Sequence, residues 1–286
     1  MSYDRYKIVR HCDAGIVWFH EPTAWTPESS LAQNAYGLSQ DWTCIVFLAR
    51  DDETYFNGRL SGGLYAARFG RRTAHLEDRV TDFIRYERDW ARQVIVAAEY
   101  PMDVPGYVAS ALRSTPPPEQ LRPYDPAIVV HSTTCERWPL IADDGRLLSA
   151  SVLRQAGRQV KAIGLETFGE PAEYGEFIHF SPLGKPSGEV VVLSHQRGTL
   201  FTDLDAAYVP GARIYLDAQR MIKDGIAVRD GLHTIKVHLA LELGPYLVDV
   251  ITAEDLDDGD EPWTPRRFAS AADDELCKRH DEACEI

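Results

Sequence analysis

Residues 129–150, VVHSTTCERWPLIADDGRLLSA, contain the pattern on which the fold prediction rests. The apolar run that ends at Val130 predicts a buried strand, and a histidine and three hydroxyl residues follow at its end. The next residues favour one or two short helices on either side of Gly145. The polar cluster at the end of this strand is therefore the first candidate for a functional site.

Downstream of this segment the chain is rich in short β-branched or aromatic runs bounded by Gly, Pro and Asp, which predict strands. These runs are AIVVHS, EFIHFS, EVVVLSHQ, ARIYLDA, HTIKVHLAL and PYLVDVI. LDAQRMIKDG predicts a single-turn helix closed by Gly225. We therefore expect the α+β fold class, with a mostly antiparallel, β-rich C-terminal domain over residues 126–268 and an acidic C-terminal tail over residues 269–286.

Upstream of this segment we expect a mixed α/β N-terminal domain, residues 1–120, of unassigned role. GIVWFH and TCIVFLA predict strands. Residues 75–100 predict one long amphipathic helix, because apolar side chains recur near helical spacing at Leu76, Val80, Phe83, Ile84, Trp90 and Val94. The segment RSTPPPEQLRPYDP has five prolines in fourteen residues and marks the domain boundary.

Charge and cysteine content limit the class of protein. A net charge of −14 argues against an extended nucleic-acid coat, which depends on clustered Lys and Arg. The chain has no run of about 18 apolar residues and no apolar region typical of a secretory signal, so we expect a cytoplasmic protein without membrane contact. Five scattered cysteines predict reduced thiols.

Three segments in the same order resemble a known superfamily. VVHSTTCERWPLIADDGRLLSA resembles the first motif of the ADP-ribosyltransferase superfamily, in which a strand ends in His-Gly-Thr before a helix and a Gly-Leu turn. EFIHFS is similar to the His-hydrophobic-Ser strand of its RNA 2′-phosphotransferase branch, and residues 211–250 resemble the closing segment of that branch. The likeness covers roughly residues 126–255.

The chain departs from that pattern in three places. Ser132 stands where the family has Gly, and the 48 residues between His131 and His179 require an insertion around residues 158–175. The third triad position, a Glu in many ADP-ribosylating toxins, falls near Leu232 or His233. The missing carboxylate speaks against a toxin-like mechanism.

The resemblance implies NAD as a co-substrate whose nicotinamide–ribose bond is cleaved through an oxocarbenium-like centre. It implies that His131 binds the ribose hydroxyls, that Ser132 and Thr133 add polar contacts, and that His179 and Ser181 lie near the nicotinamide ribose. A phosphorylated acceptor needs guanidinium groups, and the candidates are Arg146, Arg197 and Arg229. The expected acceptors are a phosphorylated small molecule, an RNA end or a protein.

Other interpretations stay open. His131 could be a strand-end histidine that only hydrogen-bonds a neighbouring carbonyl, and VRDGLH could be a plain hairpin turn around Asp230 and Gly231. The domain could be a non-catalytic nucleotide-binding or regulatory module, or an assembly protein that uses its apolar strands as an interface. CKRHDEAC near the C-terminus lacks a fourth ligand and a zinc-module spacing, so we expect no metal and a frayed tail there.

Overall fold

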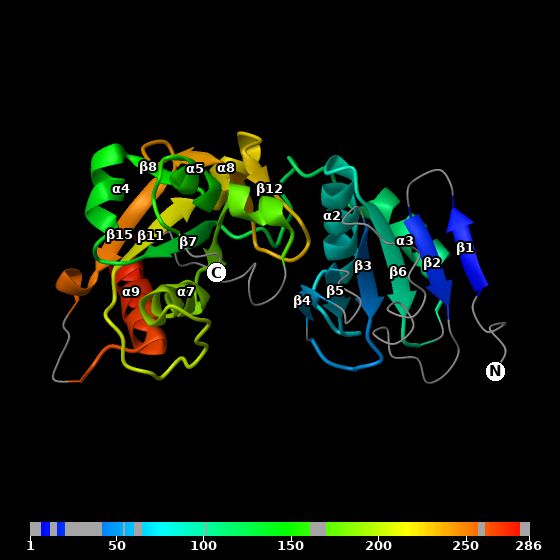
Figure 1. The fold of residues 1–286 in the computed structure, drawn as a ribbon, viewed down its shortest axis with the longest axis horizontal. Helices are drawn as coiled ribbons and strands as arrows, with labels where there is room; N and C mark the ends of the chain where they lie inside the picture. The colour runs from blue at the N-terminus through cyan, green and yellow to red at the C-terminus, as the bar shows by residue number, and fades with distance from the viewer. Residues whose placement is uncertain are drawn as a thin grey trace. The chain divides into compact units, whose positions relative to one another are not determined.

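The structure, a computed structural model, describes residues 7–11, 16–20, 42–53, 55–59, 65–100, 102–160, 170–256 and 261–280. The chain divides into two compact units (Figure 1). Unit 1 is Met1–Pro117 with the short segments Phe168–Pro171 and Arg229–Leu232, and unit 2 is Pro118–Thr167, Ala172–Val228 and His233–Ile286. The first boundary falls inside the proline-rich segment.

Unit 1 is built on a six-stranded sheet in the order β1-β2-β6-β3-β5-β4. Its strands are β1 (Lys7–His11), β2 (Ile16–His20), β3 (Trp42–Phe47), β4 (Tyr55–Arg59), β5 (Tyr65–Phe69) and β6 (Gln93–Ala98). The four inner strands are parallel, and the edge strands β1 and β4 are antiparallel to their neighbours. β3, β5 and β6 are almost continuously buried, as expected of parallel strands covered on both faces.

Two helices, α2 (Leu76–Asp89) and α3 (Val104–Ser114), pack on this sheet. The predicted long helix over residues 75–100 is therefore only half right. α2 ends at Asp89, Ala91 adopts φ 55°, and the apolar run that follows is the central strand β6. A short apolar run buried on both faces cannot be distinguished from a helix face by periodicity alone.

Unit 2 is antiparallel throughout its described strands. A four-stranded sheet has the order β10-β7-β11-β15, a three-stranded sheet the order β12-β13-β9, and β14 pairs with β8. The strands are β7 (Ile128–Thr133), β8 (Arg146–Leu148), β9 (Phe177–His179), β10 (Ser181–Pro182), β11 (Ala212–Asp217), β12 (Ala227–Val228), β13 (Lys236–His238), β14 (Ala240–Glu242) and β15 (Leu247–Thr252). The α+β prediction is confirmed at the level of helices combined with antiparallel sheets.

The main core of unit 2 lies between these sheets. Val129 and Ile214 from the four-stranded sheet pack with Ile178 and Val237 from the three-stranded sheet and with Leu147 from β8. The helical elements of unit 2 are α4 (Trp138–Asp144), α5 (Ala150–Gln155), η1 (Ala172–Glu176), α7 (Ser187–Arg197), α8 (Ala218–Lys223), η2 (Ala253–Asp255) and α9 (Pro265–Arg279). The predicted short helices around Gly145 and before Gly225 are confirmed.

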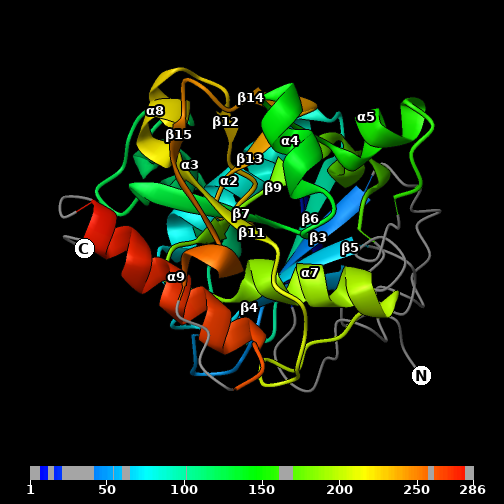
Figure 2. The same cartoon turned by 90° about the vertical axis from the view of Figure 1, so that its left-hand side faces the viewer.

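Two expectations for unit 2 are wrong. EVVVLSHQ is not a strand, because its residues form α7, which buries Glu189, Val192 and Leu193 and ends at Gly198 with φ 74°. The C-terminal segment is not a frayed tail as far as Arg279, because α9 buries Phe268 and other apolar side chains against the core. α7 and α9 lie on the same side of the four-stranded sheet (Figures 1 and 2).

Two further findings bear on the class of protein. Cys277 is disulfide-bonded, so the expectation of reduced thiols is wrong at this position, whereas Cys44 and Cys135 are free thiols. Sequence spacing alone does not show which sulfurs lie within bonding distance. Among the helices of the described ranges, none is both long and apolar enough to span a bilayer. The predicted insertion lies largely outside the described residues, since residues 161–169 are among those left out.

Candidate functional site

Strand β7 presents its polar residues to two different faces of the four-stranded sheet. His131 lies opposite Ile214 of β11, and Ser132 lies opposite Arg213. Because neighbouring strand residues point to opposite faces, His131 shares the face of the core residue Val129, while Ser132 lies on the face that α7 and α9 contact. The side chains of His131 and Ser132 therefore cannot contact one ligand from the same face of the sheet.

His131 is part-buried and contacts the chain that follows β9. Its Nδ1 lies 3.3 Å from the carbonyl oxygen of His179, and its ring lies edge-on to Phe180 with centroids 6.1 Å apart. A carbonyl only accepts, so Nδ1 carries the proton and Nε2 is the acceptor of the neutral ring. Burial lowers the pKa of His131 below its ordinary value, with a further decrease from Arg137, and the carbonyl hydrogen bond opposes them. The ring is therefore neutral at neutral pH.

His179 is brought to His131 across 48 residues of sequence, and the contact joins the ring of one to the main chain of the other. Ile178 and Phe180 enter the core, as the predicted strand alternation requires. The His179 ring points elsewhere: its Nε2 lies 3.1 Å from the Tyr174 carbonyl oxygen. By the same argument Nε2 carries the proton.

A cluster of aromatic and basic side chains surrounds the His179 ring. The His233 ring lies 4.5 Å from it between centroids, and the Tyr174 ring lies 6.0 Å from His179 and 5.6 Å from His233. The buried ammonium of Lys236 sits 4.2 Å from the centre of the Tyr174 ring. We call Tyr174, His179, His233 and Lys236 the His179 cluster. His233 is one of the two residues near which the third triad position is expected, and its ring is tilted against the His179 ring with an interplanar angle of 56°.

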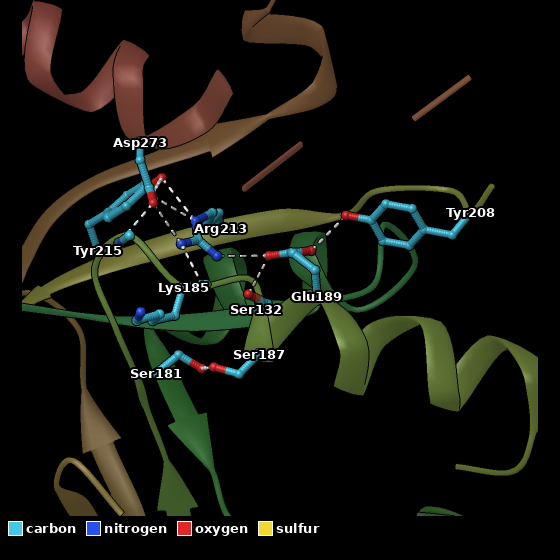
Figure 3. Close-up of polar contacts among 10 residues, drawn as sticks. Ser132, Ser181, Lys185, Ser187, Glu189, Tyr208, Arg213, Tyr215 and Asp273 are labelled. Carbon is cyan, nitrogen blue, oxygen red and sulfur yellow. Dashed lines mark hydrogen bonds and ion pairs between the residues drawn. The ribbon is translucent and has the colours of Figure 1, made fainter. Parts of the chain in front are cut away.

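The other face of β7 carries a buried polar network (Figure 3). The Ser132 hydroxyl donates to Glu189 Oε1 at 2.5 Å, and the Tyr208 hydroxyl donates to Glu189 Oε2 at 2.8 Å. Gly188 permits this approach of α7 to β7, because a Cβ there would lie 2.4 Å from the Ser132 oxygen. Ser132 is thus engaged by the protein itself, and its side chain does not lie with His131 as the resemblance implies.

Arg213 connects this network to the C-terminal helix. Its Nη1 donates to Glu189 Oε1 at 3.2 Å, and its Nε and Nη2 donate to the two carboxylate oxygens of Asp273 at 2.9 and 3.1 Å. Burial raises the pKa of Glu189, although Arg213 and the hydroxyl donors stabilise the carboxylate. Burial alone would lower the pKa of Arg213, but Asp273, Tyr215 and Glu189 together outweigh it and hold that pKa above its usual range. The network fastens β7, β11, α7 and α9 together.

The remaining predicted site residues are dispersed. Thr133 is buried at the end of β7, and the Ser181 hydroxyl accepts from Ser187 at 2.8 Å. Arg146 is half-buried and paired with Asp144 and Glu242. Arg229 is buried but belongs to unit 1, whereas His131 and His179 belong to unit 2.

Arg197 is exposed, and its Nη2 donates to the Ala207 carbonyl. Of the three arginines predicted for the acceptor phosphate, the half-buried Arg146 and the exposed Arg197 are therefore open to solvent, whereas Arg229 is buried.

Sequence reasoning missed Tyr174, Lys236, Glu189 and Arg213. A signal existed for Arg213, because it interrupts the otherwise apolar strand ARIYL and a charge in a buried strand needs a partner. No such signal marked Tyr174, whose role depends on its carbonyl. Within the described ranges, no group of three or more His, Cys, Asp or Glu side chains could hold a metal ion.

Chemically, the His131 side of this region offers two imidazoles, each held by a hydrogen bond to a main-chain carbonyl, from Nδ1 in His131 and from Nε2 in His179. Such rings accept hydrogen bonds from hydroxyl groups, and a neutral ring is also able to take up a proton. When the chain is compared with protein-family models, with curated proteins and with solved structures, none matches.

Proposed function

We propose that unit 2 is an NAD-dependent transferase domain, similar to the RNA 2′-phosphotransferase branch of the ADP-ribosyltransferase superfamily. It would cleave the nicotinamide–ribose bond of NAD, release nicotinamide and transfer the ADP-ribosyl group to a phosphorylated acceptor. The observation that supports this most is the contact between His131 and His179. The His131 Nδ1 atom lies 3.3 Å from the main-chain carbonyl oxygen of His179, so the two predicted motifs, 48 residues apart, are in contact through the ring of one histidine and the backbone of the other.

In this proposal the two imidazoles handle the ribose. The neutral His131 ring accepts a hydrogen bond from a ribose hydroxyl at Nε2, because Nδ1 is already committed to the His179 carbonyl. His179, held by Tyr174, orients the nicotinamide ribose, with Thr133 and Ser181 as further polar contacts. Holding the dinucleotide in one geometry reduces the entropic cost of reaching the oxocarbenium-like transition state.

The acceptor is proposed to be phosphorylated, either a small molecule, an RNA end or a protein. Arg146 and Arg197 are the accessible guanidinium groups of unit 2 proposed for its phosphate. The chain has 44 acidic and 30 basic residues, and this negative charge disfavours binding along an extended RNA. Recognition of RNA would therefore be confined to a phosphorylated end.

The experiment is to incubate the full chain with NAD and quantify nicotinamide by chromatography, with and without 2′-phosphorylated RNA. We expect release by the wild type, and a loss of at least about 100-fold in His131→Ala, since a positioned acid–base or orienting group contributes on that order. His280→Ala, which removes a half-buried histidine whose Nε2 lies 3.1 Å from Asp249 Oδ2, is the control and should retain the rate. If neither the wild type nor His131→Ala releases nicotinamide, the enzymatic function is excluded.

A second candidate is a non-catalytic nucleotide-binding or regulatory module. The hydrogen bond from His131 to a main-chain carbonyl favours it, because this is the arrangement of a histidine that serves the fold alone. The second candidate predicts heat on titration with NAD or ADP-ribose and no nicotinamide release. Calorimetry and the release assay on the same preparation separate the two.

A further inference from the structure

We propose that Lys236 is a positioning residue that fixes the orientation of the His179 ring through Tyr174. The inference builds on the function proposed above and adds a residue that the family resemblance does not assign. Lys236 lies directly opposite His179 in the antiparallel pairing of β13 with β9. Residues opposite each other in such a pair share one face of the sheet, so their side chains lie together.

The Lys236 ammonium is held between two aromatic faces. Its Nζ lies 4.2 Å from the centre of the Tyr174 ring and 4.4 Å from the centre of the Phe177 ring. The lysine is fully buried, and both rings are buried as well. Removing an ammonium from water is costly, and attraction to the faces of aromatic rings offsets part of that cost. The charge therefore constrains where the Tyr174 ring can lie.

Tyr174 passes this constraint to the imidazole. Tyr174, whose ring covers the ammonium, also accepts a hydrogen bond from His179 Nε2 at its carbonyl oxygen, with an N–O distance of 3.1 Å. Its ring packs against both His179 and His233. Displacing Tyr174 would move the acceptor that selects the tautomer and the surface on which both imidazoles rest. Lys236 thus acts on His179 indirectly.

A neutral side chain of similar length at position 236 should no longer hold the Tyr174 ring and, through it, the His179 ring. Lys236→Met keeps the aliphatic stem and removes the charge, whereas Lys236→Arg keeps a cation that binds aromatic faces. Lys223→Met, on the exposed side of α8 in the same unit, is the matched control. Circular dichroism and thermal denaturation establish that each variant is folded.

The readout is the ring ¹⁵N spectrum of His179, assigned with His179→Gln and recorded without NAD. We expect one tautomer, protonated at Nε2, in the wild type, in Lys236→Arg and in Lys223→Met, and a mixture of tautomers in Lys236→Met. Unchanged shifts in folded Lys236→Met would overturn the proposal. A wild-type ring protonated at Nδ1 would overturn it too, and this result needs no variant.

NAD binding provides the second readout. We expect the dissociation constant to rise at least about fivefold in Lys236→Met and to return to the wild-type value in Lys236→Arg. If the wild type does not bind NAD, the proposed function fails while the tautomer result still decides the role of Lys236. If NAD binds equally well to wild type and Lys236→Met, the positioning role is wrong and the proposed function stands.

Discussion

Arg213 of β11 holds Asp273 of α9 through two hydrogen bonds, Nε to Oδ1 at 2.9 Å and Nη2 to Oδ2 at 3.1 Å. The guanidinium also donates to Glu189 of α7, so one buried cation serves two carboxylates on two helices. Tyr215 adds a hydrogen bond to Asp273 at 2.8 Å. The face of the sheet opposite His131 is therefore organised by charge rather than by apolar packing alone.

Replacing Arg213 by Met should strongly destabilise unit 2, because Glu189 and Asp273 would be left without their cation. Removing one partner of a buried ion pair costs about 3–5 kcal/mol. Arg266→Met, which breaks an exposed pair with Asp205, should cost about 1 kcal/mol or less. Urea denaturation of both variants provides the comparison. Equal losses would show that the Arg213 network contributes no more than a surface pair.

Ser132→Ala should lower the free energy of unfolding by about 1–2 kcal/mol, because Glu189 loses a buried donor. Ser187→Ala, which removes an exposed hydroxyl, should change it by less than about 0.5 kcal/mol. NAD affinity should be unaffected by Ser132→Ala, since this side chain faces away from His131. A tenfold loss of affinity without loss of stability would instead support the ligand contact that the resemblance implies.

His131 should give the protein a stability that is lost in mild acid. Burial holds its pKa below the ordinary 6.5, so as pH falls below 6.5 the unfolded chain binds a proton before the folded chain does. The free energy of unfolding therefore decreases between pH 6.5 and the lower pKa of the folded state. In His131→Gln this contribution is absent, so the difference in free energy of unfolding between wild type and variant should be smaller at pH 5.5 than at pH 7.5. A difference in free energy of unfolding that does not change with pH would contradict the lowered pKa of His131.

Ala91→Gly should stabilise unit 1 by about 0.5–1 kcal/mol, because Ala91 ends α2 in the left-handed region that glycine adopts without strain. The Ala91 N–H bond to Arg88 does not involve the side chain and should persist. Ala271→Gly, inside α9, should have the opposite sign and cost about 1 kcal/mol. Thermal denaturation distinguishes the two signs, and a loss in both variants would contradict the argument.

The sequence predicted those parts of the fold whose local pattern agrees with their tertiary role. β7, β9 and β11 are β-branched runs bounded by turn residues, and they are strands. The strand prediction for EVVVLSHQ was wrong because three consecutive valines favour a strand locally. The helix is instead set by the burial of Glu189, Val192 and Leu193 at helical spacing and by Gly198 at its end. Tertiary contacts outweighed propensity there.

For the candidate site, the two histidines could be predicted from the sequence, but the residues around them could not. The motif resemblance selected His131 and His179, and the contact between them is a property of the folded chain. Strand alternation could have separated His131 from Ser132 beforehand, since adjacent strand residues face opposite sides. The contacts of Lys236 with Tyr174 and Phe177 join residues about 60 positions apart in the sequence. They form only when β9 pairs with β13, and no local sequence pattern encodes that pairing.

The segment Arg229–Leu232 has a practical consequence for dissecting the protein. It belongs by its contacts to unit 1, where Gly231 accepts a hydrogen bond from Arg79 and leaves no room for a Cβ against the Arg79 carbonyl. Cleavage after Pro117 would therefore leave Arg229–Leu232, like Phe168–Pro171, on the C-terminal fragment although both segments belong to unit 1. The N-terminal fragment would be incomplete, so expression of the halves should be judged only after co-expression has been tried.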